Sequence, residues 1–244
     1  MKIVLQVSGG IGKIIIGQTL FSSITGGVEN RINNSCLGFI GGGDYNFIVP
    51  TTGPTTVTGS LISGGRANKV HDSLATIAGG FTNTIHAGGE RSVISGGNDH
   101  NIFAQGAVIG GGVCNTINVG SNVGVIAGGE MNQIVQGGQH SAIGGGINNT
   151  ITGSCSVIAG GDNNTVNGAY SAILGGNNNS DGGLPNTMIV GNGITAAVSG
   201  ALHVNNLWMA PATYNTFAGI APGGTFPNGT IYADTTAGNT LRIQ

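Results

Sequence analysis

Ser141–Gly146 reads Ser-Ala-Ile-Gly-Gly-Gly and is followed closely by Asn149-Thr150-Ile151. The phrase returns 15 residues later, where Ser156–Gly161 reads Ser-Val-Ile-Ala-Gly-Gly ahead of Asn164-Thr165-Val166. Self-similarity at a fixed short period is typical of a solenoid, in which each repeat forms one unit stacked on the next. The sequence therefore predicts a repeat architecture.

The isoleucine before the glycine pair sets the register of the array. Successive copies of this isoleucine are 15 to 17 residues apart, except for one interval of 22 residues. Weaker copies extend the array back to Val7 and forward to Ile189. The anchors are Ile24, Ile40, Ile62, Ile77, Ile94, Ile109, Ile126, Ile143, Ile158 and Ile173. We expect a repeat domain over residues 1–198 with about 11–12 coils of roughly 16 residues, and an insertion loop at residues 49–58 within the long interval.

Each repeat favours strands over helices. Sixteen residues are too few for a helical hairpin, and a glycine pair in every unit would destabilise helices. Two short apolar stretches separated by turn-forming residues indicate strands. The expected fold is an all-β parallel β-solenoid, a rod of roughly 55 Å if coils stack about 4.8 Å apart.

The first strand of each repeat has apolar or small residues on both faces. Val157 and Ala159 flank Ile158, and Ala142 and Gly144 flank Ile143. In the second strand the outward slot instead holds residues such as Lys69. A strand that is apolar on both faces is typically buried on both. Because one narrow coil has a single interior, we expect the first strands to pack against other copies of the chain in a homo-oligomer.

One slot of the repeat holds asparagine in nearly every copy. Its members are Asn30, Asn46, Asn68, Asn83, Asn115, Asn132, Asn149, Asn164 and Asn179, with His100 as the exception. An inward-facing amide can satisfy the backbone of its own turn and of the neighbouring coil. We interpret the slot as structural; a ladder that binds a ligand is the alternative.

Composition narrows the class of protein. Glycine supplies 49 of 244 residues, only 7% of residues are charged and the formal net charge is −2. These values lie far from an ordinary globular domain. Disordered chains share such compositions, but they lack a recurring buried-type isoleucine. With no basic cluster, we expect no nucleic-acid binding.

The chain offers few signs of export or membrane insertion. Residues 1–7 are too short and too polar for a signal peptide, and no apolar run reaches transmembrane length. The three cysteines, Cys36, Cys114 and Cys155, are odd in number and lack metal-binding spacing. Cys114 occupies a turn slot of the repeat, so we expect an exposed or half-buried free thiol there, as suits assembly in a reducing cytoplasm.

Two motifs suggest ligands only superficially. Gly9–Lys13 resembles a phosphate-binding loop, but Ile14 stands where such a loop has Ser or Thr, and the segment fits the repeat register. Gly-Gly-Asp stretches such as Gly160–Asp162 resemble calcium β-roll repeats, yet the acid occurs in only a few copies. We expect no cofactor and no metal site.

Catalytic residues are equally sparse. The acids lie mainly in turns without a recurring close pair. His140 with Ser141 or Ser156 could form a dyad, but both serines occupy a slot of the repeat. We expect no catalytic residues and no enzymatic activity.

The composition changes after Ser199. Three β-type runs follow, Ala201–Val204, Gly229–Asp234 and Asn239–Gln244. We expect residues 199–244 to form a small β cap at the end of the solenoid. Its core, or an exposed contact surface, would comprise Trp208, Tyr214, Phe217 and Phe226.

The repeats over Ile109–Gly120 and Ile143–Ser154 resemble those in heads of trimeric autotransporter adhesins and related phage tail-fibre proteins. Gly229–Ile243 is similar to a segment found late in many phage fibre proteins. The resemblance covers nearly the whole chain and implies left-handed parallel β-rolls packed as a homotrimer. An autotransporter would also need a signal peptide and a membrane barrel, whereas a virion fibre needs neither.

We therefore expect a structural fibre protein of a phage or phage-like virion, assembled in the host cytoplasm. Its partners would be other virion proteins and a glycan or protein receptor on the host surface. The first alternative is a bacterial extracellular adhesin or filament protein. The second is a β-solenoid that binds ice or glycan, although its exposed slot mixes threonine with Arg, Lys and Gln. The sequence does not identify receptor-binding residues; Val49–Thr56 and the cap are the places to search.

Overall fold

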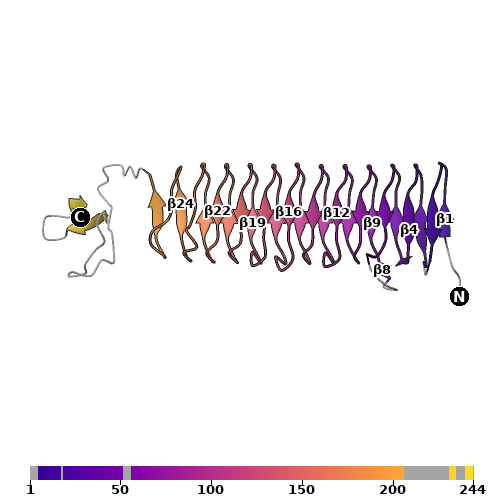
Figure 1. Ribbon diagram of the computed structural model, residues 1–244, viewed down its shortest axis with the longest axis horizontal. Helices are drawn as coiled ribbons and strands as arrows, with labels where there is room; N and C mark the ends of the chain where they lie inside the picture. The colour runs from indigo at the N-terminus through magenta and orange to yellow at the C-terminus, as the bar shows by residue number, and fades with distance from the viewer. Residues whose placement is uncertain (1–4, 18, 52–55, 206–230, 235–239, 244) are drawn as a thin grey trace. The chain divides into compact units, whose positions relative to one another are not determined.

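The computed structural model describes residues 5–17, 19–51, 56–205, 231–234 and 240–243. Parallel strands stack into a β-solenoid of about 12 coils at a spacing near 16 residues (Figure 1), and the described residues contain no helix. The predicted fold class is confirmed.

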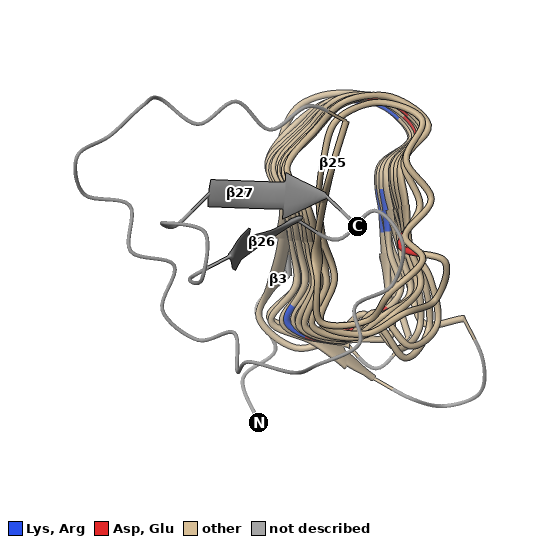
Figure 2. Cartoon of the chain, turned by 90° about the vertical axis from the view of Figure 1, so that its left-hand side faces the viewer, with Lys and Arg blue, Asp and Glu red and all other residues tan. Residues whose placement is uncertain are grey.

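Two large sheets run along the solenoid and face each other across a narrow interior (Figure 2). The first sheet has 13 strands: β1 (Leu5–Val7), β3 (Ser22–Ile24), β6 (Phe39–Ile40), β9 (Leu61–Ile62), β11 (Thr76–Ile77), β13 (Val93–Ile94), β15 (Val108–Ile109), β17 (Val125–Ile126), β19 (Ala142–Ile143), β21 (Val157–Ile158), β23 (Ala172–Ile173), β24 (Met188–Val190) and β25 (Leu202–Val204).

The second sheet has 10 strands: β2 (Ile14–Ile16), β4 (Arg31–Asn33), β7 (Phe47–Ile48), β10 (Lys69–Val70), β12 (Thr84–Ile85), β14 (Asn101–Ile102), β16 (Thr116–Ile117), β18 (Gln133–Ile134), β20 (Thr150–Ile151) and β22 (Thr165–Val166). A small parallel pair joins β5 (Ser35–Cys36) to β8 (Val57–Thr58) beside the insertion. Residues 52–55 of the predicted insertion loop lie outside the described residues.

In-register pairing stacks each slot of the repeat into a column. Ile126 pairs with Ile143 and Ile143 with Ile158 in the first sheet, while Ile134 pairs with Ile151 in the second. These isoleucines have no exposed surface. The two facing columns form one continuous core, which explains how a chain with few aromatic residues buries apolar surface.

The glycine pair is required by the turn that follows the first strand. Gly129, the second of its pair, has φ +88°, and a Cβ there would overlap the carbonyl oxygen of Gly146 in the next coil. A Cβ on Gly128, the first of the pair, would come no closer than 3.9 Å to another atom, the carbonyl oxygen of Gly111. Only the second glycine of the pair therefore meets both a conformational and a steric constraint.

Two further turn columns adopt positive φ with residues other than glycine. One contains Cys114, Met131 and Asn148, and the other contains Val123 and His140. Asparagine tolerates this conformation, whereas a β-branched valine is strained in it. The sequence did not predict these columns, because their residue types vary from coil to coil.

The chain divides into two compact units, Met1–Asn206 and Leu207–Gln244. The run Ala201–Val204, which we assigned to the cap, instead supplies β25, which pairs in parallel with β24. Leu202 faces Met188 in this pairing although the glycine pair is absent, because strand pairing requires only the backbone.

In the second unit, β26 (Ile231–Asp234) and β27 (Thr240–Ile243) form an antiparallel pair at the two predicted runs. Trp208, Tyr214, Phe217 and Phe226 lie outside the described residues.

Candidate functional site

The outer face of the first sheet carries no charged residue from β3 (Ser22–Ile24) to β25 (Leu202–Val204). We call it the apolar face and define it by the two columns that flank the buried isoleucines and, in β25, His203. The column before the isoleucine contains Ser23, Phe39, Leu61, Thr76, Val93, Val108, Val125, Ala142, Val157, Ala172, Met188 and Leu202. The column after it contains Thr25, Gly41, Ser63, Ala78, Ser95, Gly110, Ala127, Gly144, Ala159, Leu174, Val190 and Val204. None of these residues is charged.

Much of this face is open to solvent in the single chain. Val157 is 42% exposed, Leu174 53% and Leu202 53%. A contiguous apolar surface on a soluble protein typically marks an interaction site. The column after the isoleucine consists mainly of Gly, Ala and Ser up to Ala159, and these small side chains allow another backbone to approach closely.

The outer face of the second sheet differs in chemistry. Lys69 and Gln133 are exposed there, and Arg31 and Thr84 are half-buried. Figure 2 shows how few charged residues the solenoid carries. The first sheet is thus apolar on its outer face and the second is polar there, as expected from the two strands of the repeat. The apolar face is therefore the candidate contact surface.

The asparagine slot forms a buried ladder between coils. The amide nitrogen of Asn149 donates to the carbonyl oxygens of Gly145 (3.0 Å) and Gly161 in the next coil (2.9 Å). Its Oδ1 accepts a hydrogen bond from the backbone N–H of Asn164 (3.0 Å). The predicted structural role is confirmed: the amide serves its own turn and the neighbouring coil. All nine asparagines of the slot are buried.

His100 interrupts this ladder. Its Nδ1 accepts a hydrogen bond from the backbone N–H of Asn115 (3.1 Å), so the neutral ring carries its proton on Nε2. The Nε2 atom is buried and makes no hydrogen bond of good geometry. Burial lowers the pKa of His100 below its ordinary value of 6.5, and the carbonyl of Gly112 and the charge of Asp99 oppose this shift.

A second buried ladder, of serines, was not predicted. Ser141 Oγ donates to the Gly153 carbonyl (3.0 Å) and accepts from the Ser156 N–H (3.0 Å), and Ser156 Oγ continues the ladder to Ser171. Both hydroxyls are thus buried and engaged with the backbone, while His140 is exposed. The structure does not bring His140 and these serines together as a dyad.

Near the end of the array a carboxylate replaces the buried aliphatic residue of the second strand, because Ser180 bridges Thr165 and Asp181 therefore follows in the slot of Val166. Asp181 is fully buried and accepts backbone N–H groups from Asn167 (2.9 Å), Gly168 (2.8 Å) and Gly183 (2.9 Å). Its role is to satisfy turn amides. Because the aspartate occurs once, the repeat pattern carried no signal for it.

Cys114 is a half-buried free thiol, as predicted, and Cys36 and Cys155 are free as well. Burial, together with the nearby carboxylate of Asp99, raises the pKa of the Cys114 thiol, which makes the reactive thiolate scarcer. No group of three or more His, Cys, Asp or Glu residues in the described part of the chain is arranged to hold a metal ion.

The phosphate-loop motif belongs to the repeat. Ile11 bridges Val28 in the next coil and Ile14 pairs with Arg31, so Gly9–Lys13 forms the turn of a coil. Among the described residues, no helix is long and apolar enough to cross a membrane.

No family model matches the chain, and no curated protein matches it at a significant level.

Proposed function

We propose that this chain is a structural fibre protein of a phage or phage-like virion, which forms a homotrimeric rod or fibre head for attachment to the host surface. The observation that carries the proposal is the apolar face, which extends along the first sheet and is exposed in a single chain. Three copies whose first sheets meet at a common axis would cover all three faces and leave the polar second sheets in solvent.

The resemblance of the repeats to fibre and adhesin heads supports the same assembly. The small residues of the apolar face, such as Ala127, Gly144 and Ala159, suit a crowded axis. The solenoid is a rigid scaffold with repeated turns on its surface, which is the usual arrangement for presenting a binding loop.

Light scattering on the purified protein tests the assembly. We expect three times the mass of one chain, and trimers that resist SDS in an unboiled gel. Val125→Asp combined with Val157→Asp places charges on two exposed positions of the apolar face. The double variant is expected to be monomeric with an unchanged circular dichroism spectrum, because neither side chain faces the isoleucine core.

The matched control is Thr150→Asp on the outer face of the second sheet, which is expected to remain trimeric. A monomeric wild-type protein would contradict the proposed trimer. A double variant that remains trimeric would contradict the placement of the apolar face at the trimer axis.

Electron microscopy with labelled antibodies tests the location. Antibodies against the purified protein are expected to label the fibres of phage-like particles released by the source culture. Labelling of the bacterial envelope in place of particles would favour the alternative, an extracellular adhesin.

The ice-binding alternative requires a flat, regular array of threonines. In the outer column of the second sheet, Thr84 and Thr116 are separated by Asn101, and Gln133 follows. The irregular column disfavours that function.

A further inference from the structure

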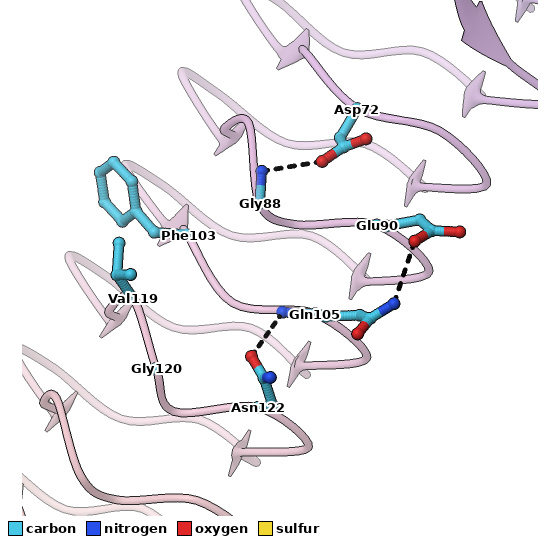
Figure 3. A pocket seen from close by; sticks show the side chains of 8 residues that line it. All are labelled: Asp72, Gly88, Glu90, Phe103, Gln105, Val119, Gly120 and Asn122. Carbon is cyan, nitrogen blue, oxygen red and sulfur yellow. Dashed lines mark hydrogen bonds between the residues drawn. The ribbon is translucent and has the colours of Figure 1, made fainter.

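A groove of about 400 Å³ crosses the turns that follow the second strand in four successive coils (Figure 3). We call it the turn groove. Phe103 and Val119 line one side of it, and Asp72, Glu90, Gln105 and Asn122 line the other. Gly88 and Gly120 add no side chains and leave the space between the two sides open. Its volume lies within the range of small-ligand sites.

The apolar side presents a ring that is held in place. Phe103 stacks on His86, with centroids 3.8 Å apart and planes at 10°. A hydrogen bond from His86 Nε2 to Asn101 Oδ1 (3.0 Å) fixes that histidine. Phe103 is half-buried and Val119 is 62% exposed. The stack thus fixes an aromatic surface before any ligand arrives.

The polar side is pinned in a similar way. Asp72 Oδ2 accepts the Gly88 N–H (2.8 Å), and Glu90 Oε2 accepts from Gln105 Nε2 (3.0 Å). Asn122 Oδ1 accepts the backbone N–H of Gln105 (3.2 Å). The other oxygens are engaged as well, Asp72 Oδ1 with the Ser73 N–H (2.7 Å) and Glu90 Oε1 with Arg91 (3.2 Å), so both carboxylates are fixed on two sides. The NH₂ group of Asn122 makes no hydrogen bond to the described residues, and each carboxylate oxygen can accept one more.

We propose that the turn groove binds a neutral saccharide chain, which makes it the receptor site of the attachment function on which this inference rests. A pyranose ring has an apolar C–H face and an edge of hydroxyl groups, and the groove opposes these with an aromatic ring and with fixed acceptors and donors. C–H groups carry a slight positive charge and favour the negative face of a ring. Polar groups held before binding reduce the entropy lost on association.

The charge of the groove selects among saccharides. Asp72 and Glu90 line it, and Arg91 forms an ion pair with Glu90 at 3.2 Å that offsets only one of the two negative charges. An acidic sugar would meet like charges, so neutral sugars are favoured. Coils about 4.8 Å apart present polar groups at intervals comparable to one sugar unit, which suits a chain that lies along the solenoid.

Other coils provide matched controls, because the same turn slots there hold different residues. Thr152 occupies the slot of Phe103, directly after the buried residue of the second strand, and Gln139 occupies the slot of Asn122. Neither lines the turn groove.

Titration calorimetry with short neutral oligosaccharides of glucose, galactose and N-acetylglucosamine tests the site on the full chain. At least one probe is expected to bind, and Phe103→Ala and Asn122→Ala each to weaken its binding about tenfold. Phe103→Tyr should preserve binding, as should the controls Thr152→Ala and Gln139→Ala. Thermal melting of each variant verifies that the fold is intact.

Three results would overturn the proposal: no binding of any probe at millimolar concentration, equal binding by the wild type and both groove variants, or tighter binding of sialylated probes. The mass of every variant is measured in parallel by light scattering. A trimer that fails to bind saccharide refutes the groove alone, whereas a monomer that binds saccharide refutes the trimeric fibre and leaves the groove intact.

Discussion

At the scale of single residues, the buried side-chain amides of the asparagine ladder hold neighbouring coils in register. Each asparagine of the ladder ties the glycine turn of its own coil to that of the next, so the polar backbone of the turns is satisfied without water. The asparagine slot was predictable because it recurs with the period of the isoleucines. The serine ladder was harder to predict, because Ser141 and Ser156 share their slot with Ala75, Ala107 and Gly124.

Asn149→Ala is expected to lower the free energy of unfolding by about 3 kcal/mol. It leaves the Gly145 carbonyl and the Asn164 N–H without partners, each at a cost of about 1–3 kcal/mol, while the Gly161 carbonyl keeps the N–H of Ile147. Urea denaturation measures the loss. Thr150→Ala, one residue away and facing outward, should change stability by less than about 0.5 kcal/mol; equal losses in the two variants would refute the role of the ladder.

His100 should make the stability of the solenoid depend on pH. Its pKa is lowered in the folded chain, so below pH 6.5 the unfolded chain binds more protons than the folded one. The contribution of His100 is therefore complete above pH 6.5 and declines as the pH falls toward its folded pKa. Protonation at Nδ1 would also place the Nδ1–H group of His100 against the backbone N–H of Asn115, so the hydrogen bond between them would be lost.

Thermal melting of the wild type and His100→Asn between pH 5 and pH 8 measures this effect. The wild type should lose more stability on acidification than the variant, which restores the ladder amide. His71, whose pKa burial also lowers, is present in both proteins and cancels in the comparison. Parallel pH profiles of the two proteins would contradict the prediction.

At the scale of the structural element, the glycine turn explains the phrase that repeats through the chain. Its second glycine combines a positive φ with close contact to the next coil, and this requirement returns in successive coils from Gly10 to Gly176. The repeat, the coil count and the two sheets were predictable from this periodicity. The turn groove was not, because its aromatic and acidic residues occur once each in four turns and have no period.

Gly129→Ala should reduce stability by about 3 kcal/mol or more, since the added methyl group meets both a left-handed backbone and the Gly146 carbonyl. Gly128→Ala provides the control, because its nearest neighbour would be 3.9 Å away. Chemical denaturation of the pair distinguishes a constraint at one position from a general preference for glycine. Similar stabilities of the two variants would contradict the proposed turn constraint.

At the scale of the whole molecule, the solenoid and the second unit were only partly predictable. The β26–β27 pair lies at the predicted runs, but β25 extends the first sheet beyond the boundary expected at residue 198. Composition changes at Ser199 whereas strand pairing continues, so composition was a poor marker of the boundary. The trimer and the virion remain predictions.

If the apolar face is a trimer interface, thermal stability should rise with protein concentration, because unfolding is then coupled to dissociation. The midpoint of the wild type is expected to increase between dilute and concentrated samples. The midpoint of the Val125→Asp, Val157→Asp variant should be lower and independent of concentration. Scanning calorimetry at several heating rates separates this effect from irreversible unfolding.

The in-register stacking also means that the length of the solenoid can change only in steps of one coil. Val157–Ser171 forms one complete coil, since Val157 pairs with Ala142 before it and Ala172 after it. Excising those residues would place Ala172 directly on Ala142, with every column still aligned. The rod would become shorter by about 4.8 Å, and duplicating the segment would lengthen it by the same step. The reach of such a rod is thus set in whole coils, by gain or loss of repeats, without any change to the surfaces that remain.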